Sequence, residues 1–141
     1  MLRFYRVWIG VLHALIGIQF FLAGYGALGT GSPDESFSLH IMNGRLIAAV
    51  ALLGILFAAL SRAGGKLVGL AAGVLGLVVL QSLIALVSVA GTTPGQIIFG
   101  FHAINALMIM GVAEASARLA KRLIAERKER AESAEALPAA A

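Results

Sequence analysis

The chain contains no cysteine and few charged residues. Of its 141 residues, 13% are Asp, Glu, Lys or Arg, whereas 60% are hydrophobic. The lack of cysteine excludes disulfides, iron–sulfur clusters, zinc–thiolate sites and covalent haem attachment of the c type. Any bound metal must therefore be held by histidine, methionine or carboxylate side chains. The shortage of charge, with a mean hydropathy of +0.93, excludes an ordinary soluble domain of this size.

Long hydrophobic runs occupy most of the sequence. Four of them, at roughly residues 7–29, 37–61, 67–90 and 97–117, are each long enough to cross a hydrocarbon layer about 30 Å thick. The first run is too long for the hydrophobic part of a cleavable signal peptide, so we expect no such peptide. The fold class is thus predicted to be all-α and integral to a membrane, with a four-helix domain over residues 1–120.

The basic residues lie on one side of these runs. They precede the first run, separate the second from the third and follow the fourth, and only Arg45 lies within a run. The two other turns, around residues 31–36 and 91–96, contain no Lys or Arg, and Ser36 or Ser38 is expected to cap the second helix. The positive-inside rule places both termini in the cytoplasm, as in a multi-pass protein of a bacterial inner membrane.

Charge returns at the end of the chain. Residues 121–141 combine a basic stretch that favours a helical extension with the low-complexity end LPAAA. We expect a cytoplasmic tail that is helical at first and partly disordered at its end. The pI near 10.1 reflects this topology and contact with anionic lipid, so the lipid bilayer is the expected partner and nucleic acid is not.

The chain also repeats itself at a spacing of 62 residues. Three pairs of polar residues keep this register, namely Gln19/Gln81, His40/His102 and Asn43/Asn105. Apolar and turn residues keep it as well, among them Leu15/Leu77, Gly29/Gly91, Phe37/Phe99 and Ile47/Ile109. Two copies of one helical hairpin, about residues 10–61 and 72–123, are therefore predicted. Both copies start on the same side, so we expect a four-helix bundle of parallel repeats about a pseudo-twofold axis.

The matched histidines are the strongest candidates for a functional site. The pseudo-twofold axis places His40 and His102 at equal depth, facing each other. Each is followed at i+3 by an asparagine and at i+4 by a small residue, giving the sets Asn43 with Gly44 and Asn105 with Ala106. These positions share one helix face. A flat macrocycle between two helices needs a ligand on each side, a small residue beside each ligand and a polar partner for the imidazole or a propionate.

Two interpretations of this pattern stay open. Histidines near helix ends are often interfacial polar residues, whereas two at one repeat position, each with its asparagine, favour a shared ligand. Buried ionisable groups in a bilayer usually serve a function. Zinc is disfavoured because two imidazoles leave half of its tetrahedral shell empty. The favoured cofactor is one haem b with His40 and His102 as iron ligands and Asn43, Gly44, Asn105, Ala106 and Arg45 around it.

Further polar residues within the runs are also candidates. Arg45, about one turn deeper than His40, is either a counter-charge for a haem propionate or an arginine that snorkels to the interface. Gln19 and Gln81 favour hydrogen bonds between helices, with contact to a quinone or the cofactor edge as the alternative. His13 is interpreted as structural, with a quinone or proton-relay role left open. Near the inner end, a surface ion pair is expected between Glu114 and Arg118.

With LHIMNG around His40 and FHAINA around His102, the architecture resembles small membrane b-type cytochromes. It looks like the four-helix haem-binding units of cytochrome b561-type proteins and of each half of haem A synthase. The resemblance implies electron transfer near the outer membrane face, with a quinone or a redox protein as partner. Two haems in the cytochrome b561 pattern need four ligands, and this chain has three histidines, which implies one haem. The chain also looks like small four-helix membrane proteins of high-GC bacteria, a likeness that carries no function.

Other function classes stay open. One alternative is a cofactor-free accessory subunit of a larger, respiratory-type membrane complex. A less favoured one is a small transporter that works as a homo-oligomer, because the spans contain few charged residues. Whether the chain is an enzyme is left undecided by the sequence.

Overall fold

The computed structural model describes residues 1–88 and 90–135. These residues form an all-helical structure whose elements are α1 (Leu2–Ala27), α2 (Pro33–Ser36), α3 (Ser38–Leu60), α4 (Gly65–Val87) and α5 (Thr93–Glu135). The four long helices are each long and apolar enough to cross a membrane. The predictions of an all-α chain and of four potential spans are confirmed. The final part of the predicted tail, residues 136–141, lies outside the described residues.

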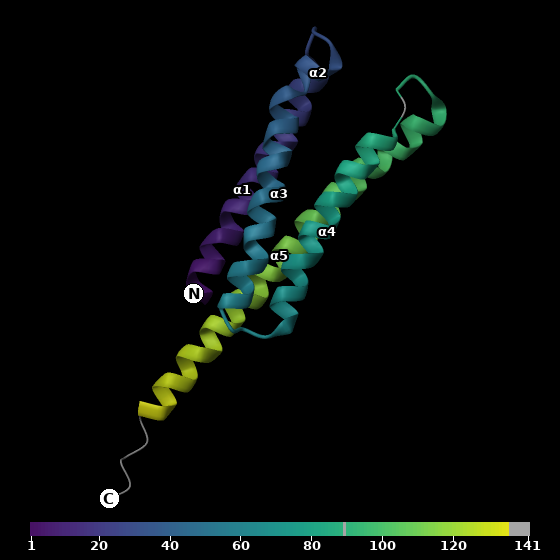
Figure 1. Cartoon of the computed structure of the whole chain (residues 1–141). Helices are drawn as coiled ribbons and strands as arrows, with labels where there is room; N and C mark the ends of the chain where they lie inside the picture. Colours follow the sequence, from purple (N-terminus) through teal and green to yellow (C-terminus); the bar gives the residue numbers. More distant parts are fainter. Residues whose placement is uncertain (89, 136–141) are drawn as a thin grey trace, which may run out of the picture.

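The four long helices are arranged in a ring. Helix α1 contacts α3 and α5, and α4 likewise contacts α3 and α5. Figure 1 shows two hairpins, one of α1 with α3 (hairpin A) and one of α4 with α5 up to residue 122 (hairpin B). Helix α2 and the start of α5 lie at one end, here named the distal end; Met1 and the end of α5 lie toward the other, the proximal end. The hairpins diverge toward the distal end (Figure 1).

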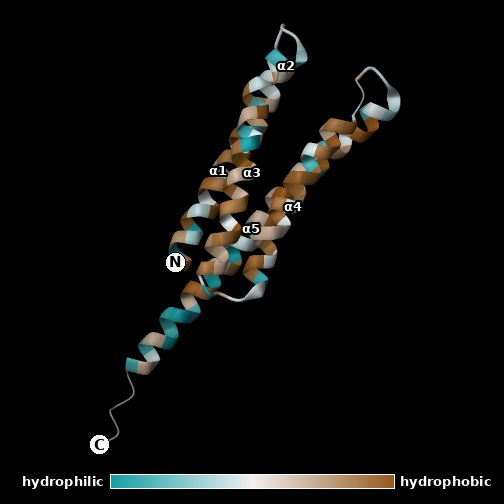
Figure 2. Ribbon diagram, viewed as in Figure 1, coloured by the Kyte–Doolittle hydropathy of each residue, from teal (hydrophilic) through white to brown (hydrophobic). Residues whose placement is uncertain are grey.

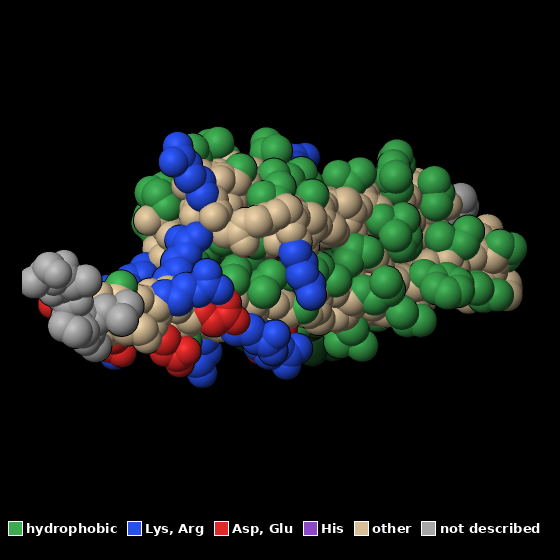
Figure 3. Space-filling model, turned by 90° about the horizontal axis from the view of Figure 1, so that it is seen from below, with side chains coloured by type: hydrophobic (Ala, Val, Ile, Leu, Met, Phe, Trp, Pro, Cys, Tyr) green, Lys and Arg blue, Asp and Glu red, His purple; other side chains and the backbone are tan. Residues whose placement is uncertain are grey.

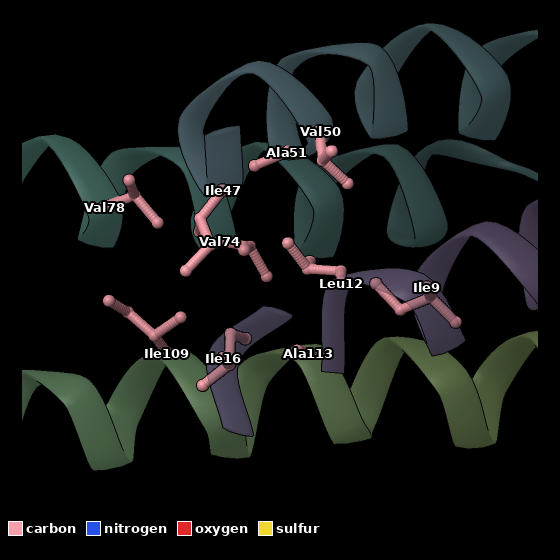
Figure 4. Close-up of a cluster of buried hydrophobic side chains, with 10 residues drawn as sticks. All are labelled: Ile9, Leu12, Ile16, Ile47, Val50, Ala51, Val74, Val78, Ile109 and Ala113. Atoms are coloured by element: carbon pink, nitrogen blue, oxygen red, sulfur yellow. The ribbon is translucent and has the colours of Figure 1, made fainter. Parts of the chain in front are cut away.

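One stripe of each long helix forms the core. Ten buried side chains from all four helices meet in the middle of the bundle (Figure 4), namely Ile9, Leu12, Ile16, Ile47, Val50, Ala51, Val74, Val78, Ile109 and Ala113. Within each helix the later members follow the earlier ones at i+3, i+4 or i+7, which keeps them on one face. A second cluster, which includes Leu2, Tyr5 and Leu67, lies nearer the proximal end. Among the described residues, no buried apolar side chain lies distal to Ile16, Ile47, Val78 and Ile109.

The short helix α2 corrects the prediction about capping. Neither Ser36 nor Ser38 caps α3, whose N-cap residue is Phe37 and has no side-chain cap hydrogen bond. Instead, Pro33 starts a helix of its own. In it Ser32 and Glu35 form a capping box, with the Ser32 amide donating to Glu35 Oε2 at 2.9 Å. These hydrogen bonds from Ser32 hold the pKa of the Glu35 carboxyl below its usual range.

Helix α5 joins the predicted fourth span and the predicted basic extension into one helix. It has 43 residues, about 65 Å in length and twice the thickness of a hydrocarbon layer. Figure 2 shows it changing from apolar to polar toward its end, and basic side chains surround this part in the proximal view of Figure 3. Arg127 donates to the carbonyl oxygens of Ser61 and Arg62 at 3.3 and 2.9 Å. This side chain ties the extension to the turn after α3.

Candidate functional site

A set of hydrogen bonds joins the two helices of hairpin A. Gln19 on α1 donates through Nε2 to the backbone oxygen of His40 on α3 at 3.0 Å. Asn43 donates through Nδ2 to Gln19 Oε1 at 2.7 Å and to the Leu15 carbonyl at 3.0 Å. We name this set a Gln–Asn clamp. It pairs two amide side chains with each other and with the backbone, so these hydrogen bonds do not depend on water.

Hairpin B contains the same clamp. Gln81 on α4 donates to the backbone oxygen of His102 on α5 at 2.9 Å. Asn105 donates to Gln81 Oε1 at 2.6 Å and to the Leu77 carbonyl at 2.8 Å. Every residue of this clamp is 62 positions after its counterpart in hairpin A. The prediction that the glutamines bond between helices is confirmed, and the asparagines make the same kind of bond.

The small residues after the asparagines lie beside the clamps. A Cβ atom on Gly44 would lie 3.3 Å from Nε2 of Gln19, so glycine gives that side chain room. Its repeat mate is Ala106, and Gln81 keeps its hydrogen bond to the His102 backbone with that methyl group present. The clamp in each hairpin thus explains why an asparagine is followed by a small residue at both repeat positions.

The structure brings the two predicted histidines together across the hairpins. The ring centroids of His40 and His102 are 6.3 Å apart, with an angle of 40° between the ring planes. The matched phenylalanines lie next to them, with Phe37 edge-on to His40 at 6.0 Å and Phe99 stacked on His102 at 4.9 Å. Both histidines lie distal to the last layer of the apolar core. They therefore face each other where the bundle has no buried apolar layer.

The ring nitrogens differ between the two histidines. Nδ1 of His40 lies 3.2 Å from the Gln19 carbonyl oxygen. A carbonyl oxygen only accepts, so Nδ1 carries the hydrogen in this contact and Nε2 keeps its lone pair. Nδ1 of His102 is buried and has no hydrogen-bond partner, although the matching carbonyl of Gln81 lies near its ring. A metal-bound histidine commonly donates its second nitrogen to a carbonyl in the manner of His40.

The separation of the rings suits two ligands of one iron. Imidazoles on opposite sides of a metal, with bonds of about 2 Å, have centroids roughly 6 Å apart, and the observed separation is 6.3 Å. No group of three or more His, Cys, Asp or Glu that could hold a metal ion occurs in residues 1–88 and 90–135. Haem iron needs only axial ligands from the protein, because the porphyrin fills its other positions. The donor set therefore fits haem better than a bare metal ion.

Arg45 lies away from the histidines. It follows His40 by five residues, which places it about 140° around the helix, and its side chain is exposed. The geometry favours the interpretation of Arg45 as a residue that snorkels along lipid over that of a counter-charge at the histidine pair.

Residues 19–93 match the family described as "Family of unknown function (DUF6220)". The match covers more than half of the 141 residues. The chain belongs to this family. The matched part of the DUF6220 protein starts at Gln19 and includes His40 and Asn43, but it ends before His102. No curated protein and no solved structure matches the chain, so the resemblance to b-type cytochromes stays a prediction.

A further polar contact, between α1 and α5, was not predicted from the sequence. His13 Nε2 lies 3.6 Å from Glu114 Oε2, and Arg118 Nε lies 3.7 Å from Glu114 Oε1. The predicted Glu114–Arg118 pair is confirmed, but the contact with His13 was missed. The reason is that His13 and Glu114 are far apart in sequence and have leucines, Leu75 and Leu52, as repeat mates.

Proposed function

We propose that this protein binds one haem b between its two hairpins and passes electrons near the outer face of a bacterial inner membrane. His40 and His102 would hold the iron of this haem, and a quinone or an outer redox protein would be the electron partner. One observation carries the proposal: two repeat-matched imidazoles lie 6.3 Å apart, distal to the last core layer. When bound, the haem supplies an iron that gains and loses one electron.

The protein's part is to hold the two imidazoles in place. The hydrogen bond from Nδ1 of His40 to the Gln19 carbonyl orients the ring and leaves Nε2 free to act as a ligand. The clamps fix the backbone at both histidines, because each glutamine binds a histidine carbonyl. Phe99, stacked on His102 at 4.9 Å, covers one face of that ring. These contacts preorganise the site before any cofactor arrives.

The proposal includes the arrangement of the chain in the membrane. The hairpins are two parallel repeats, and the distal end faces outward with both termini in the cytoplasm. The repeat is supported by the clamps, whose residues and partners recur at a spacing of 62. The orientation is supported by the basic residues that surround the proximal end (Figure 3).

The visible absorption spectrum of the detergent-purified protein tests the function. A bis-histidine haem is expected to give sharp bands in the reduced state and to bind carbon monoxide weakly. His40→Ala and His102→Ala should each abolish or strongly alter this spectrum, while the matched control His13→Ala should leave it unchanged. Both site variants keep their clamps, because the glutamines bind backbone oxygens of the histidines. Loss of the spectrum is therefore separable from loss of the fold.

A second function has one observation in its favour. The amide nitrogens of all four clamp side chains donate within their own hairpins, as expected if the bundle needs no cofactor. A cofactor-free accessory subunit of a larger membrane complex explains this equally well. A protein that stays colourless when expressed with ample haem, and that copurifies with other membrane subunits, supports this alternative and refutes the haem proposal.

A further inference from the structure

The ring of His13 has one nitrogen whose state is fixed by the backbone. Nδ1 lies 2.7 Å from the carbonyl oxygen of Ile9, one turn earlier on α1. A carbonyl oxygen cannot donate, so Nδ1 carries a hydrogen. The second nitrogen, Nε2, is buried and has no hydrogen-bond partner, and the nearest carboxylate oxygen, Oε2 of Glu114, lies 3.6 Å away.

This arrangement is unfavourable unless it contains a further proton. A bare Nε2 lone pair and an ionised Glu114 are both acceptors, and at this distance they repel each other. One proton turns the contact into an attraction, either as imidazolium with carboxylate or as imidazole with carboxylic acid. We infer that His13 and Glu114 form a binding site for one shared proton in the interface between α1 and α5.

The groups around the pair favour the proton on the histidine. Arg118 Nε lies 3.7 Å from Oε1 of Glu114 and stabilises the ionised carboxylate. Arg6 on α1 and Lys121 on α5 lie seven residues away toward the proximal end, about 10 Å along the axis, on the same helix faces. On the neighbouring helices, Arg45 of α3 is exposed and Lys66 lies in the first turn of α4. These neighbours are all cationic, so they stabilise the Glu114 carboxylate but repel a protonated imidazole, and Glu114 is the group that attracts the proton to His13.

The repeat indicates that packing does not require this pair. The interface of α3 with α4 corresponds to that of α5 with α1, and there the two positions are Leu52 and Leu75. An apolar pair therefore suffices at the same place in the other half. Ionisable groups at a helix interface in a bilayer are costly and usually serve a function. The site lies nearer the proximal end than the histidine pair, and it does not depend on a bound haem.

Nitrogen NMR of the full-length protein, labelled with ¹⁵N-histidine in lipid nanodiscs, tests the inference. We expect the neutral form of His13 to carry its hydrogen on Nδ1. We also expect the parent to carry a hydrogen on Nε2 as well, seen as a second one-bond ¹H–¹⁵N coupling, and Glu114→Gln to lose that coupling. Glu129→Gln, which removes one acidic charge from the same helix far from His13, is the matched control and should change nothing. A parent without the Nε2 coupling, a Glu114→Gln variant that keeps it, or a neutral form with its hydrogen on Nε2 would overturn the inference.

A double variant covers the case in which Glu114→Gln does not fold. His13→Leu with Glu114→Leu copies the interface of the other half and should keep the helical content seen by circular dichroism. Infrared difference spectra between acid and alkaline samples should show a carboxylate and imidazole band pair in the parent that is absent from the double variant. If the parent and the double variant give the same difference spectrum, no proton is shared at this site.

Discussion

Replacing Asn43 by leucine should destabilise hairpin A by about 2–4 kcal/mol. The variant loses two hydrogen bonds between α1 and α3, to Gln19 Oε1 and to the Leu15 carbonyl. In membranes such bonds contribute on average about 0.6 kcal/mol each. The larger share comes from Gln19 Oε1, which loses its donor, and a stranded buried acceptor costs about 1–3 kcal/mol.

The double variant Gln19→Leu with Asn43→Leu separates these two contributions. It removes both amides, so no acceptor is stranded, and it should cost less than the sum of the two single variants by about 1–3 kcal/mol. Met42→Leu, an exposed position beside Asn43, is the control and should stay within about 0.5 kcal/mol of the parent.

Unfolding in mixed micelles with increasing dodecyl sulfate measures these free energies. The single tryptophan, Trp8, serves as the probe, because its indole donates to the Val50 carbonyl at 2.9 Å and so joins α1 to α3. Strict additivity of the two single variants would refute the clamp as an energetic unit. A loss below about 0.5 kcal/mol for Asn43→Leu would refute the cost assigned to the stranded oxygen.

Four other outcomes are expected. Asp34→Cys should react with an impermeant thiol reagent in intact cells and Ser133→Cys should not; the reverse would overturn the topology. Gly44→Ala should stabilise the protein by up to about 1 kcal/mol in thermal unfolding, because the clamp of hairpin B forms with Ala106 at the matching position; a variant less stable than the parent would contradict this. Arg45→Gln should leave the reduction potential of bound haem unchanged, and a lowered potential would place the charge at the cofactor. Acid should loosen the α2 capping box, because the pKa of Glu35 is lowered and the stability this gives is lost as the pH falls through that pKa. The amide NMR shifts of α2 should report the change, and in Glu35→Gln these shifts should not change over the same pH range.

The sequence predicted the helices better than their ends. Hydropathy indicates which residues lie in lipid, whereas backbone hydrogen bonding continues through polar residues where nothing interrupts it. Helix α1 therefore starts at Leu2, before the predicted boundary, and includes Arg3 and Arg6. Helix α5 continues to Glu135 because no glycine or proline follows Gly111 until Pro138. At the first turn, Pro33 started a helix that hydropathy could not show.

The repeat register predicted which polar residues share a face but not what they bind. That His40 and His102 face each other followed from the matched positions and the expected symmetry. That each glutamine binds a histidine carbonyl depends on how far α1 is shifted along α3, which no sequence pattern specifies. The contact between His13 and Glu114 breaks the repeat, so the signal that found the other sites was absent there.

The confinement of both clamps within hairpins has a consequence for biosynthesis. The hydrogen-bond partners of Gln19 and Asn43 lie on α1 and α3, and those of the equivalent residues of hairpin B lie on α4 and α5. If the two hairpins are inserted one after the other, the amide nitrogens of each clamp can find their acceptors before the other half arrives, and of the clamp amides Oδ1 of Asn105 is left buried without a partner. Docking of the two hairpins then joins mainly apolar stripes, and the histidines meet only at that last step.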